Sequence, residues 1–509
     1  MAATAVDSGI QRTASAVDYS DVQGLVRFGY GKLTESCFLL LNIRDAAAAR
    51  SWLATAPVTN AVQLDQASPT ALQIAFTHEG LQSLQVPDEV LAGFSAEFLT
   101  GMAGEESRSR RLGDVGANAP EYWQWGGSGR VPHIVLMLYA QPGKLEGWTL
   151  AIQEANWNAA FEVVTCLLTS NLDGIEPFGF ADGISQPALD WERQRKPAKN
   201  ELAYGNLAAL GEFLMGYPNE YSKYTDRPLL APDAPGSTAL PPAEDVANQR
   251  DLGRNGTYVV FRQLQQDVRG FWRFLDAQTN SDPQARQSMG EDMVGRKMDG
   301  EPLVELSDDP IAGIDPGTTP HNQFTYNSDA DGLSCPFGAH VRRANPRNAD
   351  LPPGSSGLLS KALHTFGFGN KQYRDDIIAS TRFHRVLRRG REYGPGLSPE
   401  QAIQTNVSDP GEHGIYFICL NANISRQFEF VQNAWIMSTK FDAMTEESDP
   451  LLGNRQPVAG CPFTDTFSVP QVEGLRTRIT GLPQFVTVKG GAYFFLPSLS
   501  ALRYLAAVR

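Results

Sequence analysis

The sequence predicts an α+β protein in which antiparallel sheets carry helices on one face and two similar halves follow each other. Short apolar runs of about six residues recur along the chain, and a helix-like pattern follows each of them. The runs are rich in Phe, Tyr and Val but interleaved with polar positions, which is typical of half-buried antiparallel strands. The first-half pattern CFLLLNI…SWL returns as TYVVFRQLQ…FWRFL, which indicates the two halves.

Each half repeats the alternation of strand and helix. The strands and helices predicted in the first half are 37–43 with 44–56, 71–76 with 77–84, and 133–140 with 146–168. Those predicted in the second half are 257–265 with 267–278, 415–421 with 424–435, and a closing strand at 492–497.

We expect two domains separated by a connecting segment. Residues 1–200 form the predicted N-terminal domain and residues 256–509 the C-terminal domain. The segment 201–255 between them is rich in Pro and charge, and it is predicted to be a linker or surface excursion. Further excursions are expected at 279–333 and 344–380, which are dense in Gly, Pro, Asp and Asn.

The composition limits the partners of the chain. With 509 residues, 42% of them hydrophobic, the chain can bury a large core. The net charge of −14 argues against nucleic acid and against an anionic membrane surface. No apolar run approaches the ~18 residues of a membrane-spanning helix. The N-terminal stretch MAATAVDSGIQRTASAVDYS has no apolar signal-peptide core, so we expect a cytoplasmic protein; a mature secreted chain given a new start Met would look the same.

The cysteines do not form a recognisable framework. The five of them are scattered and include no C-x-x-C pair, so neither a disulfide framework nor a zinc knuckle is expected. They are Cys37, Cys166, Cys335, Cys419 and Cys461.

The stretch FGFADGISQP (178–187) places one carboxylate, Asp182, between glycines in apolar company. Asp-Gly is a common turn dipeptide, because glycine accepts positive φ and the Asp side chain bonds nearby backbone. The alternative interpretation is that the glycines let a flat, bulky group approach the backbone, with the carboxylate aimed at it.

His340 stands out among the seven histidines. It follows the apolar CPFGA and leads into a cationic run. A haem needs an imidazole for its iron and cationic donors for its two propionates, and this stretch offers both. The cations of the run are Arg342, Arg343 and Arg347. The alternative is an ordinary basic loop.

A second basic cluster lies in HRVLRRG, where Arg385, Arg388 and Arg389 precede Gly390. The cluster is predicted to end a helix, where cations interact well with the helix dipole. On a helix, His384 and Arg388 would share one face, and one arginine could turn inward over a cofactor.

Three segments in this order resemble the dye-decolorising peroxidases, a family of haem enzymes. They are G-x-x-D-G at 179–183, CPFGAHVRRANPR at 335–347 and LRRGREYG at 387–394. The resemblance extends from DVQGLVRFGYG, which starts at residue 21, to the C-terminal AYFFLPSLSALRYLA. It implies two ferredoxin-like domains, each an antiparallel sheet with helices packed on it. It also implies one haem b (iron protoporphyrin IX), held mainly by the C-terminal half.

The resemblance also implies roles for individual residues. Asp182 matches the distal acid-base and Arg388 the distal arginine. His340 matches the axial ligand of the iron, and Asp449 in ESDPLLG the carboxylate behind it. The residues expected along the haem are Gly183, Ile184, Ser185, Arg343, Ile415 and Phe417. Tyr393 and Trp435 match surface radical sites; their alternative roles are capping a turn and packing against the sheet.

The function implied is a peroxidase that reduces H2O2 and oxidises dyes, phenols and similar reductants through a ferryl intermediate. One alternative is a haem-binding or haem-handling protein without peroxidase turnover, with Cys335 or Cys461 as a thiolate ligand. Another is a structural interaction module. The 48 positions from His340 to Arg388 exceed the spacing in compact secreted fungal members and resemble a longer-chain subgroup, which leaves substrate size open. The physiological reductant (dye, phenol, Mn(II) or protein) and the oligomeric state also stay open.

Overall fold

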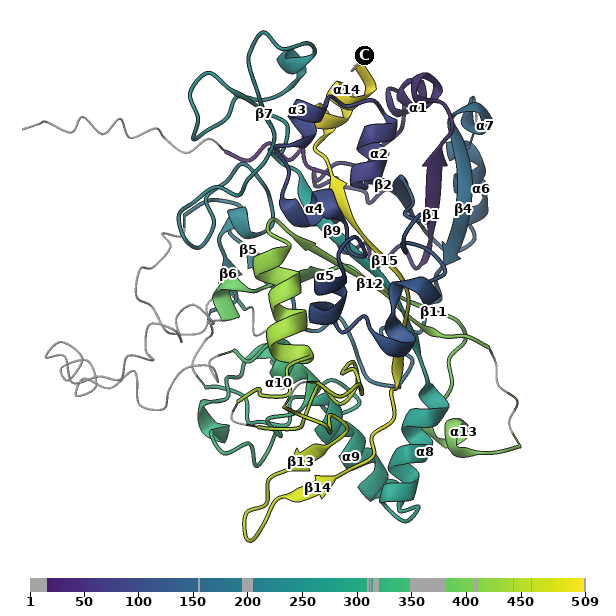
Figure 1. Cartoon of the computed structure of the whole chain (residues 1–509), viewed down its shortest axis with the longest axis vertical. Coiled ribbons are helices and arrows are strands. Elements are labelled where there is room, and N and C mark those ends of the chain that lie inside the picture. The colour runs from purple at the N-terminus through teal and green to yellow at the C-terminus, as the bar shows by residue number, and fades with distance from the viewer. Residues whose placement is uncertain are drawn as a thin grey trace, which may run out of the picture.

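One antiparallel sheet runs through the molecule (Figure 1). The computed structural model describes residues 16–153, 156–194, 205–308, 311, 313–314, 320–347, 381–406, 408, 411–442, 444–458 and 460–507. The strands of the sheet are β1 (Glu35–Ile43), β2 (Thr70–Phe76), β3 (Ile134–Ala140), β4 (Phe161–Leu168), β9 (Thr257–Gln266), β10 (Leu387–Arg388), β11 (Arg391–Tyr393), β12 (Gly414–Asn421) and β15 (Val486–Leu496). They pair in the order β10-β12-β9-β15-β2-β3-β1-β4, with β11 beside β12.

The C-terminal strand β15 joins the two halves of the sheet. It pairs along most of its length with β9 of the second half, and at Phe495 with Phe76 of β2. The prediction of an α+β protein with antiparallel sheets and helices is therefore confirmed. Each half contributes its own antiparallel set of strands, as predicted, and the two sets join at the pair Phe495–Phe76.

The sheet curls, so that one face of each half packs on a shared aromatic core. Phe38 of β1 makes edge-to-face contacts with Phe261 of β9 and Tyr416 of β12, at ring-centroid distances of 5.4 and 5.7 Å. Just beyond β4, the Ser170 N–H donates to the carbonyl of Glu392 in β11 at 2.9 Å. The two ends of the sheet, near β4 and near β11, therefore meet across this core.

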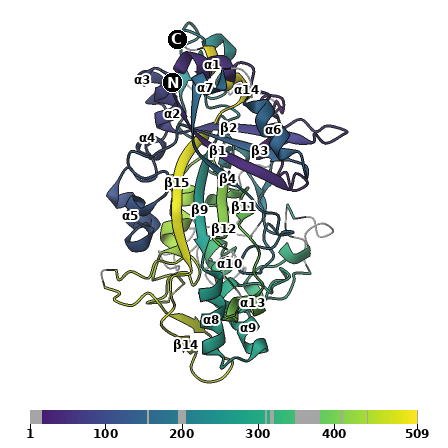
Figure 2. The same ribbon diagram turned by 90° about the vertical axis from the view of Figure 1, so that its right-hand side faces the viewer.

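Helices cover the other face of the first half. Phe38 lies in the inner core, whereas Leu39 and Leu41 pack under the helices, as the two-residue period of a strand requires. Figure 2 shows α1, α7 and α14 gathered at one end of the molecule. The helices of this half are α1 (Ala46–Leu53), α2 (His78–Ser83), α3 (Asp88–Leu91), α4 (Ala96–Thr100), α5 (Glu106–Leu112), α6 (Leu145–Ile152) and α7 (Trp157–Ala160), joined by the C-terminal α14 (Leu499–Ala507).

Helices α8 (Val268–Gln278), α9 (Pro283–Val294) and α13 (Pro399–Ile403) of the second half lie toward the lower end of the molecule in Figure 1. The second half also contains α10 (His340–Ala344) and π-helical turns at Ser425–Glu429 and Val431–Ile436. Helix α9 has strong local signals: Asp282 caps its N-terminus before Pro283, and Gly295 ends it at a φ of +92°. No helix in the described ranges is both long and apolar enough to cross a membrane.

Short two-stranded sheets complete the described structure. They are β5 (Ala188–Leu189) with β6 (Leu207–Ala208), β7 (Leu229–Leu230) with β8 (Arg250–Asp251), and β13 (Phe467–Val469) with β14 (Thr477–Ile479).

The helix predicted over 146–168 is wrong in its second part. Helix α6 ends at Ile152, and FEVVTCLL forms the strand β4. The β-branched residues Val163, Val164 and Thr165 favour a strand, and most of β4 is exposed because it lies at the end of the ladder. The apolar residues that suggested helix continuity belong to two elements that meet at Phe161.

The helix end predicted at HRVLRRG is also wrong, because Arg388 lies in the strand β10. Gly390 passes so close to β12 that a Cβ there would lie 2.6 Å from the Tyr416 carbonyl. The glycine therefore permits a close approach of two strands and does not cap a helix. His384 and Arg388 do not share a helix face.

The connecting segment 201–255 is more than a surface excursion. Among its described residues, Leu210, Phe213 and Leu214 belong to the inner core. The excursion predicted at 279–333 contains the helix α9, and most of that predicted at 344–380 lies outside the described residues.

Candidate active site

A cavity of about 300 Å³ is lined by residues of both halves and contains most of the residues singled out by the sequence. Its walls come from the loop around Asp182, from β12, from α10 and from the π-helical turns. Most of its lining side chains are apolar, as in sites for small molecules and cofactors. They include Phe178, Phe180, Ile184, Leu264, Val341, Val386, Ile415, Phe417, Phe428, Val431, Ile436 and Leu451.

His340 begins α10 and lines this cavity. Its Nδ1 lies 2.9 Å from Oδ2 of Asp449, a fully buried carboxylate that also accepts the N–H groups of Leu451 and Leu452. Burial opposes the charge of both partners, yet Asp449 raises the pKa of His340, and His340 holds the pKa of Asp449 below its ordinary value. With Nδ1 occupied by Asp449, Nε2 is the nitrogen left for a ligand in the cavity.

Asp182 and Arg388 form the second polar pair of the cavity. Arg388 Nη1 donates to Asp182 Oδ1 at 2.9 Å, and both side chains are about 35% exposed because they face the cavity. Burial opposes ionisation of Asp182, but the Arg388 guanidinium, the Gly183 N–H and His340 together hold its pKa below the ordinary value. Asp182 is therefore an ionised carboxylate beside a cation.

The loop that carries Asp182 adopts the backbone conformation that its glycines permit. Gly179 has a φ of +101° and Gly183 a φ of +75°. A Cβ added at Gly183 would meet no atom within 4 Å, so open space adjoins the backbone there. Ile184 and Ser185 line the cavity, and the Ser185 carbonyl accepts from Arg388 Nη2 at 3.3 Å.

Ile415 and Phe417 reach the cavity from the strand β12. As alternate residues of β12, they share one face of the strand, and both line the cavity.

Arg343 lies away from the cavity, in contrast to the predicted cofactor contact. It is fully buried, and its three guanidinium nitrogens donate to the carbonyls of Trp435, Glu447 and Ser438. Arg343 thus ties α10 to neighbouring chain segments. Arg347, from the same cationic run, lines the cavity instead.

Tyr393 and Trp435 are not surface residues, so the predicted surface position is wrong for both. Each is only 5% exposed. Tyr393 stacks on Tyr416 at 4.5 Å, in the inner core of the sheet. Trp435 lines the cavity and belongs to a small apolar cluster with Phe441 and Met444.

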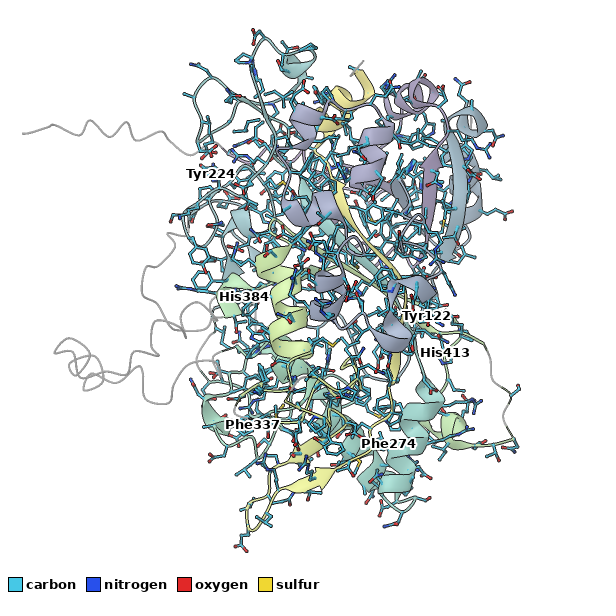
Figure 3. The ribbon with its side chains drawn as sticks, in the orientation of Figure 1. Tyr122, Tyr224, Phe274, Phe337, His384 and His413 are labelled. Carbon is cyan, nitrogen blue, oxygen red and sulfur yellow. The ribbon has the colours of Figure 1, made fainter. Side chains whose placement is uncertain are left out.

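Two further residues line the cavity without a sequence motif that marks them. Glu176 was not singled out; its carboxylate accepts the N–H groups of Phe178 and Phe180, and burial raises its pKa to about 7. The sequence alone indicates no function for His384. Its ring stacks on Phe430 at 3.6 Å, and Figure 3 shows it beside the π-helical turns. The position of Glu176, two residues before Phe178 in the same apolar stretch, was the available signal.

The cysteines proposed as alternative ligands are buried outside the cavity. Cys335 is 1% exposed and Cys461 3% exposed, and neither lines the cavity. Burial raises the pKa of Cys335 to about 12, which disfavours a thiolate.

Comparisons with known proteins agree with this geometry. No family model matches the sequence. The chain is 28% identical to the dye-decolorizing peroxidase msp1 of Mycetinis scorodonius, over 97% of this chain and 89% of that protein. It is 29% identical to the dye-decolorizing peroxidase AauDyP1 of Auricularia auricula-judae, over 98% of this chain and 88% of that one. A solved decolorizing peroxidase from Auricularia auricula-judae superposes with a TM-score of 0.68 at 25% identity, covering 96% of this chain and 100% of the other.

The fold, the cavity and the relatives together define a peroxidase. The chain is similar to dye-decolorising peroxidases over nearly its whole length, and the resemblance stated from its sequence is confirmed.

Proposed function

We propose that this protein is a haem peroxidase that reduces H2O2 and oxidises small organic reductants such as dyes and phenols. The observation that carries the proposal is the presence of two polar pairs in one apolar cavity, His340 with Asp449 and Asp182 with Arg388. A haem-binding protein without turnover needs the first pair alone. The names of the related peroxidases support the same reaction.

The residues of the cavity fit haem b. Apolar side chains from several elements suit the faces of a porphyrin, and His340 offers a nitrogen as the axial ligand. Arg296, Arg347 and Arg385 also line the cavity and supply positive charge for two propionates. When bound there, haem b would supply the redox chemistry, the two-electron reduction of H2O2 and the return of single electrons from the reductants.

Asp182 is the proposed acid-base. Reduction of H2O2 to water requires a proton to move from one peroxide oxygen to the other, so that water can leave. An ionised carboxylate can accept that proton and then return it to the leaving oxygen. The Asp182 side chain faces the cavity and is held in the ionised form, so it meets both requirements.

Arg388 has two proposed roles. Its guanidinium keeps Asp182 ionised, and its partly exposed side chain in the cavity can stabilise negative charge that develops on the leaving oxygen. Asp449 accepts a hydrogen bond from His340 Nδ1 and increases the basicity of the imidazole.

The test compares haem content and turnover. We expect purified protein to bind haem with a histidine-ligated absorption spectrum and to oxidise a phenol and an anthraquinone dye only when H2O2 is present. The variant His340→Ala should lose most of the haem, whereas His78→Ala in α2, away from the cavity, should keep it. Full haem content with an unchanged spectrum in His340→Ala would exclude this ligand. Haem-loaded protein without peroxide-dependent turnover would favour the haem-binding alternative.

A further inference from the structure

Two cysteines that are far apart in the sequence lie side by side in the sheet. The sulfur atoms of Cys37 and Cys166 are 3.7 Å apart. The register of β1 and β4 pairs Cys37 with Leu168 and Leu39 with Cys166, so the two cysteines are diagonal neighbours on one face. Neither lines the cavity of the proposed peroxidase.

The two thiols have different surroundings. Cys37 is 1% exposed and packs in the core under the helices, whereas Cys166 is exposed on the strand at the end of the ladder. The hydrogen bond between the sulfurs lowers the pKa of Cys166 to about 7 and raises that of Cys37. The accessible sulfur is therefore the one that becomes a thiolate near neutral pH, which is the form that reacts with oxidants.

We propose that Cys37 and Cys166 form an oxidisable dithiol that H2O2 converts into a disulfide. The Cys166 thiolate attacks one oxygen of H2O2, the O–O bond breaks, and the leaving hydroxide takes up a proton to become water. Cys166 is then a sulfenic acid. The Cys37 sulfur displaces its hydroxyl group, which leaves with the Cys37 proton as a second water. The two thiols lose two electrons and two protons in total, and H2O2 gains them.

The position of β4 allows the sulfurs to close. They must approach from 3.7 Å to the ~2.0 Å of a disulfide bond. Because β4 ends the order of the described strands and pairs there with β1, it can shift without displacing a strand on its other side. H2O2 is also the oxidant of the proposed function, but the dithiol reaction requires neither haem nor Asp182.

The experiment oxidises the full-length protein and maps its thiols. Reduced protein is treated with H2O2 in the absence of a reductant, alkylated, digested and examined by mass spectrometry. We expect a linked pair of peptides that contain Cys37 and Cys166, and the loss of two of the five thiols. Cys37→Ser should instead leave a Cys166 sulfenic acid that dimedone traps. Cys461→Ser, at a buried thiol elsewhere, is the matched control and should keep the linked pair.

Three outcomes would overturn the proposal: Cys166 that stays fully alkylatable after peroxide, a Cys166 link to another chain in place of Cys37, or a linked pair that persists in Cys37→Ser preparations through a different cysteine. Asp182→Asn separates this inference from the proposed function. The link should form equally in that variant, whether or not the variant turns over dye. A link that requires Asp182 would show oxidation through the cavity and would contradict direct attack by Cys166.

Discussion

The carboxylate of Asp182 can accept a proton only while it is ionised, and Arg388 opposes the burial that would protonate it. We expect Arg388→Leu to raise the pKa of Asp182, because burial then acts with less opposition. The pH below which the reaction with H2O2 slows should therefore move upward. The measurement is the second-order rate of reaction with H2O2 against pH, by stopped-flow absorption. Arg388→Lys, which keeps a positive charge, should shift the profile less; equal profiles in all three proteins would contradict this role.

Asp182→Asn tests the proton transfer itself. The amide keeps the size of the side chain but cannot act as the base, so the reaction with H2O2 should slow by roughly 10²–10⁴-fold. Haem content should stay unchanged, since Asp182 is not the proposed ligand. A variant that reacts at the parental rate would remove Asp182 from the mechanism.

The raised pKa of Glu176 should make the stability of the fold depend on pH. Burial raises its pKa from an ordinary value near 4.5 to about 7, so the folded protein binds this proton more tightly than the unfolded chain does. Its contribution is full below about pH 4.5 and is lost as the pH rises through about 7, by up to about 3 kcal/mol. The Tm of Glu176→Gln should therefore gain on that of the parent between about pH 5 and about pH 8. A constant difference across this range would contradict the raised pKa.

Some residues of the site could be predicted from local sequence motifs, and others could not. Asp182 and His340 stand in short motifs, where glycines or a cationic run mark the chemistry. Glu176 and Arg296 reach the same cavity from stretches without such marks, and only the folded chain brings them there. The sequence could not distinguish Arg343 from Arg347, because both belong to one short basic run. They are four residues apart, and only Arg347 lines the cavity.

At the scale of elements, the approach of β10 and β12 depends on Gly390. We expect Gly390→Ala to destabilise the protein by about 1–3 kcal/mol, because the added Cβ meets backbone and not a flexible side chain. Arg388 lies two residues earlier, so the reaction with H2O2 should slow as well. Thermal unfolding and stopped flow measure the two effects.

The matched control is Gly147→Ala within α6. A Cβ at Gly147 meets no atom within 4 Å, and alanine favours a helix by up to about 1 kcal/mol, so this variant should be neutral or slightly more stable. Equal losses in the two variants would show that the close approach of the strands is not the cause.

The long strands were predictable because their content of Phe, Tyr and Val and the length of each apolar run both indicate a β-strand. Local signals were weakest where two elements meet without a break. The helix α7 runs directly into β4 at Phe161, and the short β10 lies in a basic run that also suits a helix end. The pairing of β15 with β2 depends on residues more than 400 positions apart, Phe495 and Phe76, and no local pattern encodes it.

At the scale of the whole molecule, the aromatic residues around the cavity bear on substrates too large to enter it. Trp435 lines the cavity on one side and packs against Phe441 on the other, whereas Tyr393 lies in the inner core away from it. We expect Trp435→Phe to lower turnover of a bulky anthraquinone dye more than that of a small phenol. A dye that stays outside the cavity must transfer its electrons into the cavity, and an oxidisable ring such as that of Trp435 assists this transfer, whereas a small phenol can enter. Tyr393→Phe is the control and should change both substrates little. Equal retention of both activities in Trp435→Phe would exclude this route.

The central position of β15 has a consequence for folding during synthesis. This strand lies between β9 and β2 in the sheet, yet it follows both of them in the sequence. Until Val486–Leu496 emerges, β2 and β9 each present an open edge, and the inner core that holds Phe38, Phe261 and Phe494 cannot close. Both halves can therefore close only once β15 has been synthesised, and until then the open edges of β2 and β9 are exposed to pairing with other chains.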